Sequence, residues 1–273
     1  IIFMYGLFGL LLIPFFFRAD RTLKIWTRIV FFFSATLMVF IGALVYIGER
    51  FFPEGSVQQS MESKLDSVLI NGSFLDAIPA RLELWVYSIS SGIFLQGGLA
   101  FAAFLLGLRM ARINFLSSPI DVEKNSKLIK FGFLLGAPIQ IIAALVLVRN
   151  EQSAEPSEAT YLLALLISFI AAPLLSMFYI GLIRKVVEEK PHLVSWMKPA
   201  GQMSLTIYIS QSVIASVIFG PWGFGLFQDL QTWQVILLAC GIWLLLVYLA
   251  SFWLKKNSQG PLEKLVNSLT KNR

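Results

Sequence analysis

The amino-acid sequence predicts an all-α polytopic membrane protein, a transmembrane helical bundle with about seven spans. Apolar runs of about twenty residues recur along the chain, and this is the length with which an α-helix crosses a bilayer. The composition agrees, because 57% of the residues are hydrophobic and only 14% are charged. Typical soluble domains carry about 25% charged residues. The mean hydropathy of +0.74 points the same way.

Seven apolar runs are the expected spans of a single integral membrane domain, residues 1–273. They lie near residues 1–17, 25–47, 82–108, 128–148, 160–183, 199–219 and 232–254. The third run contains Gly97 and Gly98, and paired glycines let a neighbouring helix approach closely. Pro138 lies in the fourth run, where the missing backbone N–H predicts a kink.

Two polar segments are expected to carry amphipathic helices. Residues 49–80 form a predicted outer loop, in which residues 57–69 have the apolar spacing of a weak helix on the membrane surface. Residues 260–270 are predicted to form a short cytoplasmic helix that begins at Pro261, a favoured first helical position. The basic character of this helix favours association with anionic lipid.

The basic residues indicate the orientation. Most of the 22 lysines and arginines lie in the loops that follow the first, third, fifth and seventh spans, whereas the alternate loops are acidic. Because cytoplasmic loops carry the excess of positive charge, the C-terminus is predicted to be cytoplasmic. The net charge of +6 has the same explanation, and we expect no nucleic-acid partner. Ile1 opens inside an apolar run, so we interpret the chain as a fragment that packs against missing N-terminal spans.

The sequence lacks the residues that several classes of catalytic or binding site require. The chain has one cysteine, Cys240, and one histidine, His192, which lies in a charged stretch that we expect to be a solvated loop. No phosphate-binding loop, dinucleotide fingerprint or metal-ligand cluster is present, so we predict neither a cofactor nor a metal. No span carries an acidic residue at mid-membrane, which disfavours a proton- or sodium-coupled transporter built from these spans alone.

The candidate site residues come chiefly from the sixth span. Gln202, Thr206, Tyr208 and Gln211 lie at helical spacing in an apolar run, so their side chains predict a cavity lining. The alternative is that they form hydrogen bonds between helices. Arg81, at the outer start of the third span, is a candidate for binding an anionic group through its planar guanidinium. Its alternative is a charge that snorkels to the interface.

Gln96 and Gln140 each lie mid-span without a charged neighbour in the sequence. A buried amide needs hydrogen-bond partners, and for both residues we favour bonding between spans over a role in a site.

A family resemblance rests on the sixth span and the C-terminus. Gly201 to Ser212, GQMSLTIYISQS, resembles the "GRMALTNYLLQS" signature of the YeiB-like bacterial membrane proteins, a family of unknown function. Gly223 to Phe227 resembles its "GYGLGLFG" turn, and Gly260 to Leu265 resembles its terminal "GPLEWLWR". Gln202 stands where arginine is usual in that signature.

The resemblance implies the plasma (inner) membrane of a bacterium, with the lipid bilayer as the main partner. The YeiB-like proteins look distantly similar to membrane acyltransferases. We therefore expect an acyltransferase-like enzyme that acts on envelope or small acceptors. The alternatives are a transporter or permease-like carrier and a non-catalytic envelope protein. The catalytic residues stay unassigned, because the acyltransferases use a membrane histidine and no span here contains one.

Overall fold

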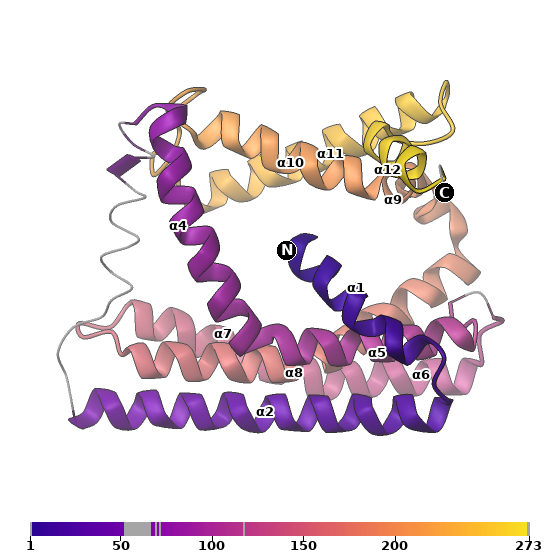
Figure 1. Ribbon diagram of the computed structural model, residues 1–273, viewed down its shortest axis with the longest axis horizontal. Coiled ribbons are helices and arrows are strands. Elements are labelled where there is room, and N and C mark those ends of the chain that lie inside the picture. The colour runs from indigo at the N-terminus through magenta and orange to yellow at the C-terminus, as the bar shows by residue number, and fades with distance from the viewer. Residues whose placement is uncertain (1, 52–66, 69, 71, 117, 272–273) are drawn as a thin grey trace. The chain divides into compact units, whose positions relative to one another are not determined.

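The computed structural model describes residues 2–51, 67–68, 70, 72–116 and 118–271. The chain forms two compact units. Unit 1 comprises Ile1–Gly55 and Trp85–Glu188, and unit 2 comprises Ser56–Leu84 and Glu189–Arg273. The described residues are helical in nearly every part and contain no β-strand, so the predicted all-α class is confirmed (Figure 1).

Helices build unit 1 almost entirely. Its elements are α1 (Ile2–Phe16), α2 (Asp20–Phe51), the π-helical turn η1 (Ile93–Gly97), α5 (Gly98–Arg112), α6 (Val122–Phe131), the π-helical turn η2 (Gly132–Gly136), α7 (Ala137–Glu151) and α8 (Glu158–Glu189). The helix α4 (Phe74–Gly92) runs without a break into η1 and α5. In Figure 1, α2, α5, α7 and α8 run in roughly the same direction, with α7 toward the left and α5 toward the right of the view.

Unit 2 is built around two long helices. Its elements are the start of α4, two short 3-10 turns (Pro191–Leu193 and Ser195–Met197), α9 (Lys198–Gln202), α10 (Ser204–Phe219), α11 (Thr232–Leu254) and α12 (Pro261–Lys271). Trp196, in the second 3-10 turn, contacts Trp243 of α11 edge to face, with ring centroids 5.4 Å apart. This contact attaches the segment before α9 to the side of α11.

Four of the described helices are long and apolar enough to cross a membrane: Asp20–Phe51, Val122–Glu151, Glu158–Glu189 and Thr232–Leu254. A fifth arises if Ser195–Gln202 and Ser204–Phe219 form one broken span. The helix over residues 3–16 is apolar but shorter than this criterion requires. The membrane-type architecture is therefore supported, whereas the number seven, the span limits and the single membrane domain remain predictions.

The helix that holds the third expected span begins at Phe74, before the expected start at residue 82. Ser73 and Asp76 explain the early start, because each satisfies the backbone of the other. The Ser73 backbone N–H donates to Asp76 Oδ2 at 2.9 Å, and the Asp76 N–H donates to Ser73 Oγ at 3.3 Å. This reciprocal capping nucleates a helix. The amphipathic helix predicted over residues 57–69 falls almost wholly outside the described residues.

Small residues allow the helices of unit 1 to pack closely. Gly98 of α5 crosses α2 at Ser34, and a Cβ atom on Gly98 would collide with the Ser34 side chain. A Cβ atom on Gly136 would lie 2.6 Å from the backbone nitrogen of Leu175 in α8. Gly132, four residues earlier, meets the α8 backbone in the same way. The expected close approach at the Gly97–Gly98 pair is confirmed.

Side-chain amides hold α8 against α6 and α7. Gln140 Nε2 donates to the Ser168 carbonyl at 2.7 Å, and the Ser168 hydroxyl donates back to Gln140 Oε1 at 2.5 Å. Asn125 Nδ2 donates to the Gly181 carbonyl at 3.0 Å. The prediction that Gln140 bonds between helices is confirmed.

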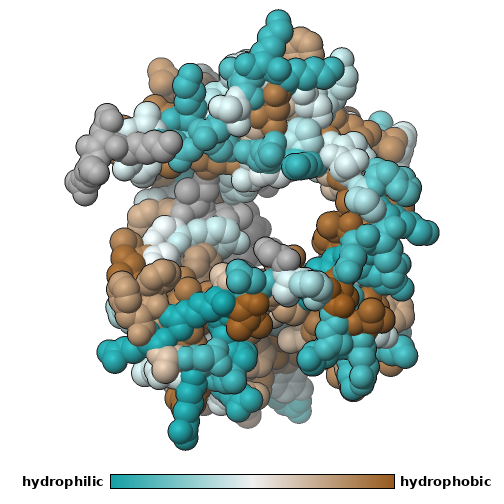
Figure 2. All heavy atoms as spheres, turned by 90° about the vertical axis from the view of Figure 1, so that its right-hand side faces the viewer, coloured by the Kyte–Doolittle hydropathy of each residue, from teal (hydrophilic) through white to brown (hydrophobic). Residues whose placement is uncertain are grey.

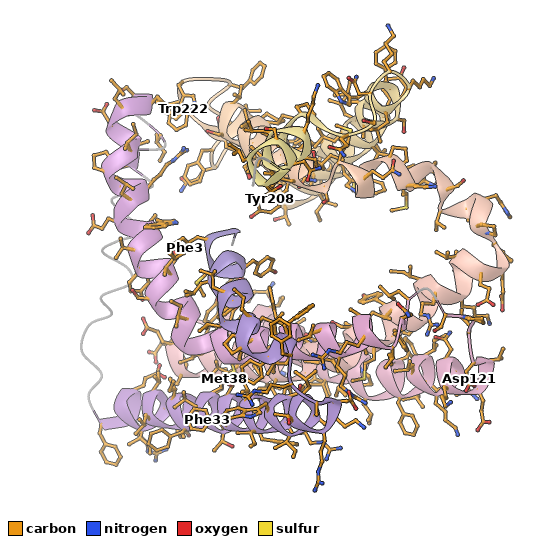
Figure 3. All side chains as sticks on the ribbon, turned by 45° about the vertical axis from the view of Figure 1, so that its right-hand side comes forward. Phe3, Phe33, Met38, Asp121, Tyr208 and Trp222 are labelled. Carbon is orange, nitrogen blue, oxygen red and sulfur yellow. The ribbon has the colours of Figure 1, made fainter. Side chains whose placement is uncertain are left out.

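The outward faces of the helices are apolar, as a lipid environment requires. On α2, Phe33 is 68% exposed, whereas Met38 is 1% exposed and points toward the neighbouring helices (Figure 3). Exposed aromatic and branched side chains of this kind recur along every long helix. In water such a surface would aggregate, so the bilayer is the environment that this surface fits.

Charged side chains tie helix ends together at the two ends of unit 1. At one end, Arg112 donates to the carbonyl oxygens of Phe15, Phe16 and Arg18. Arg184 donates to the Ser118 carbonyl at 3.2 Å at the same end. Figure 2 looks onto this end and shows many hydrophilic side chains there. These loops are the ones that the charge pattern assigns to a common side.

At the other end of unit 1, Glu49 of α2 caps the start of α8. Its carboxylate accepts hydrogen bonds from the Ser157 hydroxyl at 2.9 Å, the Glu158 N–H at 3.2 Å and the Ala159 N–H at 2.9 Å. A carboxylate at a helix N-terminus satisfies free N–H groups and complements the helix dipole. The end of α2 and the start of α8, which belong to two of the acidic loops, are therefore in contact.

Candidate functional site

The sixth span bends sharply near its start. The segment Ser195–Gln202 meets Ser204–Phe219 at 82°. Met203, at the corner, has φ −115° and ψ 31°, and its side chain is buried and forms no cap. Because α10 starts afresh after this bend, its first backbone N–H groups need acceptors from elsewhere.

Glu263 of α12 supplies these acceptors. The backbone N–H groups of Leu205 and Thr206 donate to Glu263 Oε1 at 2.8 and 3.1 Å. The Thr206 hydroxyl donates to Glu263 Oε2 at 2.5 Å, and it accepts a hydrogen bond from the Leu262 N–H at 3.1 Å. We call this contact between Thr206 and Glu263 the α10–α12 clasp.

The clasp changes the acidity of Glu263. Burial raises the pKa of this carboxyl, and it is the largest single effect. The hydrogen bonds from the Thr206 side chain, the backbone and Leu205 together outweigh it and hold the pKa below its usual value. Glu263 is therefore ionised at neutral pH, where the positive end of α10 stabilises the charge.

Gly260 permits the clasp to form. It is buried, and a Cβ atom at this position would collide with the Glu263 carboxylate and the Thr206 hydroxyl. The two stretches that carry the family resemblance most clearly, from Gly201 and from Gly260, are therefore in direct contact in unit 2.

A cavity of about 620 Å³ lies in the same unit, at the other end of α10. Its walls are the C-terminal half of α10, the turn that follows it, the start of α11 and α4. Phe219, Leu226, Leu230 and Val235 make most of the lining apolar, and Ser212, Ser216 and Gln228 add polar groups. This volume lies within the range of about 300–1,000 Å³ that small-molecule sites occupy.

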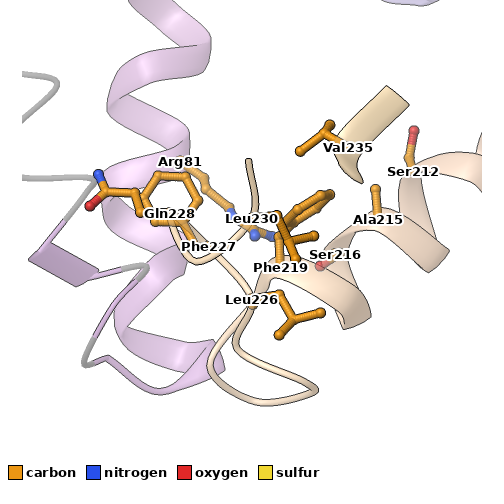
Figure 4. Close-up of a pocket in the computed structure, with 11 residues that line it drawn as sticks. Arg81, Ser212, Ala215, Ser216, Phe219, Leu226, Phe227, Gln228, Leu230 and Val235 are labelled. Carbon is orange, nitrogen blue, oxygen red and sulfur yellow. The ribbon is translucent and has the colours of Figure 1, made fainter. Parts of the chain in front are cut away.

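Arg81 is the charged residue of this cavity. Figure 4 shows its side chain extending from α4 toward Phe219 and Leu230. Its guanidinium carbon lies 4.7 Å from the ring centroid of Trp222, and Phe74 contacts the same indole edge to face at 5.3 Å. The stack holds the guanidinium over an aromatic face. Within the described part of the chain, no carboxylate forms an ion pair with Arg81.

The structure does not bring the five predicted cavity residues together. Arg81 lines the cavity, and Thr206 belongs to the clasp. Gln202 is exposed at the end of α9, Tyr208 is 38% exposed and Gln211 is half-buried. None of Gln202, Thr206, Tyr208 and Gln211 is among the residues that line the Arg81 cavity. A site role for them remains a prediction.

Sequence reasoning missed Ser216 and Glu263, whereas Ser212 stands out in the sequence as one of the polar residues of the sixth span. Ser212 and Ser216 are four residues apart and so share a face of α10, which is a signal that the spacing carries. Ser212 Oγ donates to the Tyr208 carbonyl at 3.3 Å, so its proton is engaged. Glu263 carried a weaker signal, an acidic residue in the first turn of a helix that begins with proline.

The cavity offers an anion one fixed cationic side chain. Among the described residues, its lining includes no carboxylate and no imidazole. His192 is exposed in the 3-10 turn Pro191–Leu193 and does not line it. An arginine over an aromatic ring offers fixed donors to an anion.

Residues 110–273 match the protein family described as a protein of unknown function, DUF418. The chain belongs to this family. The expectation of a membrane-type family of unknown function is thereby supported, whereas the YeiB-like resemblance and the similarity to acyltransferases remain predictions.

Two relatives come from Bacillus species. The chain is 24% identical over 279 residues to the uncharacterized protein YxaH of Bacillus subtilis (strain 168), covering 97% of this chain and 64% of YxaH. It is 32% identical over 103 residues to an uncharacterized 39.9 kDa protein in the amylase 3' region of Bacillus acidopullulyticus, covering 37% of this chain and 29% of that protein. No solved structure matches the chain.

Proposed function

We propose that this membrane protein binds an amphiphilic anion in the Arg81 cavity. The observation that supports this most directly is the placement of one guanidinium at an otherwise largely apolar cavity. The guanidinium would bind a carboxylate or phosphate through two parallel hydrogen bonds. Phe219, Leu226 and Leu230 would cover an apolar chain, whose burial supplies most of the affinity.

Such binding is the first step of both activities that the sequence suggests. An acyltransferase-like enzyme would use the cavity for an acyl-bearing donor or acceptor, and a permease-like carrier would use it for a transported solute. Among the described residues, the cavity lining contains no general base of the kind that acyl transfer by a hydroxyl nucleophile needs. The geometry therefore favours binding, with acyl transfer and transport as separate assays on the bound molecule.

The proposal includes a location and a lipid contact. The alternating basic loops and the Bacillus relatives support the bacterial plasma membrane, with the C-terminus in the cytoplasm. On α12, Leu265 and Leu269 are 55% and 71% exposed, and Lys264 is exposed beside them. An exposed apolar face next to lysines fits a helix that lies on anionic lipid.

Calorimetric titration of the purified chain in a neutral detergent tests the binding. Decyl phosphate and the decyltrimethylammonium cation share the chain and differ in charge, so we expect only the phosphate to bind. Arg81→Gln should weaken decyl phosphate binding by about tenfold or more, because hydrogen bonds to a charged group are lost. Ala215→Phe, which fills the cavity, should abolish it.

Arg149→Gln is the matched control, because Arg149 is an exposed arginine of unit 1 and does not line the cavity. This variant should bind decyl phosphate as the parent does. Equal binding of decyl phosphate and the decyltrimethylammonium cation would contradict the proposal. So would an equal loss of affinity for decyl phosphate in Arg81→Gln and Arg149→Gln. A radiolabelled acyl donor and vesicle uptake then distinguish transfer from transport.

A further inference from the structure

A second cavity lies within unit 1, between α2, α5 and α8, with a volume of about 560 Å³. Leu99 and Ala103 of α5 and Ile170 and Leu174 of α8 belong to its apolar lining. Farther along α2, Gly42 packs closely against Leu163 and Leu166 of α8. The cavity therefore lies toward the basic end of α2 from this close contact.

Within the described part of its lining, this cavity has one polar side chain that is free to donate hydrogen bonds. Thr27 and Arg28 are the only polar side chains among its described lining residues. The Thr27 hydroxyl donates to the Leu23 carbonyl at 2.7 Å, so its proton is engaged. Arg28 is thus the one lining side chain whose N–H groups have no hydrogen-bond acceptor among the described residues of its unit.

Arg28 lies inside a helix that the sequence treats as membrane-spanning from residue 25. Helix α2 begins at Asp20 and is long and apolar enough to cross a bilayer. At ~1.5 Å per residue, Arg28 is about 12 Å from that start. Asp20 pairs with Lys24 at 3.0 Å and with Arg109 at 2.7 Å. No ion pair of Arg28 occurs among the residues that the structure describes, and a cation within a span calls for a partner.

We propose that an anionic phospholipid occupies this cavity, with its phosphate on Arg28 and one acyl chain among α2, α5 and α8. Arg28 is exposed, and an arginine side chain is long enough to reach the head-group level from within a span. Its planar fork matches a phosphate. The remaining lining offers apolar contacts that suit an acyl chain and no donor for a second polar group. This inference is independent of the Arg81 cavity, which lies in the other unit.

Native mass spectrometry of the purified, delipidated full chain tests the proposal. The probes are dioleoyl phosphatidylglycerol and dioleoyl phosphatidylcholine, which share their acyl chains. We expect the parent to bind phosphatidylglycerol about tenfold more tightly, because both lipids offer a phosphate to Arg28 but the choline cation of phosphatidylcholine cancels the negative charge of its head group. Arg28→Gln should remove the preference, and Ala103→Phe, at an exposed lining position, should weaken binding of both lipids.

Arg21→Gln is the matched control, since it removes the same charge from the same end of α2 at an exposed position outside the cavity. It should retain the parent's preference for phosphatidylglycerol. Thermal unfolding of each variant checks that it is folded, and Arg28→Lys replaces Arg28→Gln if the latter does not fold. Equal preferences in Arg28→Gln and Arg21→Gln, no preference in the parent, or competition by inorganic phosphate alone would each overturn the proposal.

Discussion

Single carboxylates and guanidinium groups decide how helix ends are held in this protein. Glu49 reaches the start of α8, and Glu263 reaches the start of α10, each from a helix far away in the sequence. Arg112 does the reverse and donates to the last carbonyl groups of α1. Each contact places a charge at the helix end whose dipole attracts it, where free backbone groups also need partners.

The α10–α12 clasp leads to a prediction at the residue scale. Glu263→Ala removes the acceptor of two backbone N–H groups and the Thr206 hydroxyl. We expect a loss of about 1–2 kcal/mol in the free energy of unfolding, the usual cost of deleting a helix cap. Lys264→Ala, at an exposed neighbouring position, should leave stability unchanged. Thermal unfolding in one detergent compares them, and equal melting temperatures for the two variants would contradict a structural role of the clasp.

The same residue predicts a pH dependence. The folded pKa of Glu263 lies below its ordinary value, so the clasp stabilises the fold fully above that ordinary value, about 4.3. This contribution is lost as the pH falls through the lowered pKa, because protonation removes the charge that the helix end attracts. The difference in melting temperature between the parent and Glu263→Ala should therefore shrink below about pH 4. A difference that stays constant to lower pH would speak against ionised Glu263.

At the scale of elements, glycines set the distance between helices. Gly136→Ala places a Cβ atom 2.6 Å from the Leu175 nitrogen, and a backbone atom cannot move aside as a side chain can. We expect a loss of about 1–3 kcal/mol, typical of overpacking. Gly107→Ala in α5 is the control, because a Cβ atom there has nothing within 4 Å. That variant should be as stable as the parent or more stable, since alanine favours a helix. Similar melting temperatures for both would contradict the close packing of η2 on α8.

At the scale of the whole molecule, the contacts of each unit agree with the side assigned to each loop. Basic loops meet one another at one end of unit 1, through Arg112 and Arg184. The acidic loops meet at the other end, through Glu49. In unit 2, Arg81 and Trp222 bring together two segments that were both assigned to the outer side. Within each unit, these contacts agree with the charge alternation, and the orientation in the membrane stays a prediction.

A labelling experiment tests which side is cytoplasmic. In a Cys240→Ala background, Ser153→Cys should react with a membrane-impermeant maleimide on intact cells, because its loop is assigned to the outside. Ser258→Cys, close to the C-terminus, should react only after the membrane is opened. Both positions are exposed, so access to the protein surface is matched. The reversed pattern would invert the proposed orientation.

The sequence by itself determined the helical class and the membrane-type character, and it predicts which loops share a side of the membrane. Both depend on local composition. An apolar run must form a helix in lipid, and the excess of lysine and arginine in a loop can be counted without knowing how the helices pack. It also identified Gly98, Gln140 and Arg81 as residues that need a partner. A glycine pair favours a closely packed helix, a mid-span amide requires hydrogen bonds, and an interfacial arginine requires an anion or water.

Only the tertiary structure decided which partners meet that need. Thr206, assigned to a cavity by its spacing, pairs with Glu263, and Arg28, close to the start of the second expected span, lies within α2 at a cavity. Spacing along one helix shows which side chains share a face, but it cannot show what lies opposite that face. The clasp and both cavities join segments far apart in the chain, so they exist only once the helices have packed.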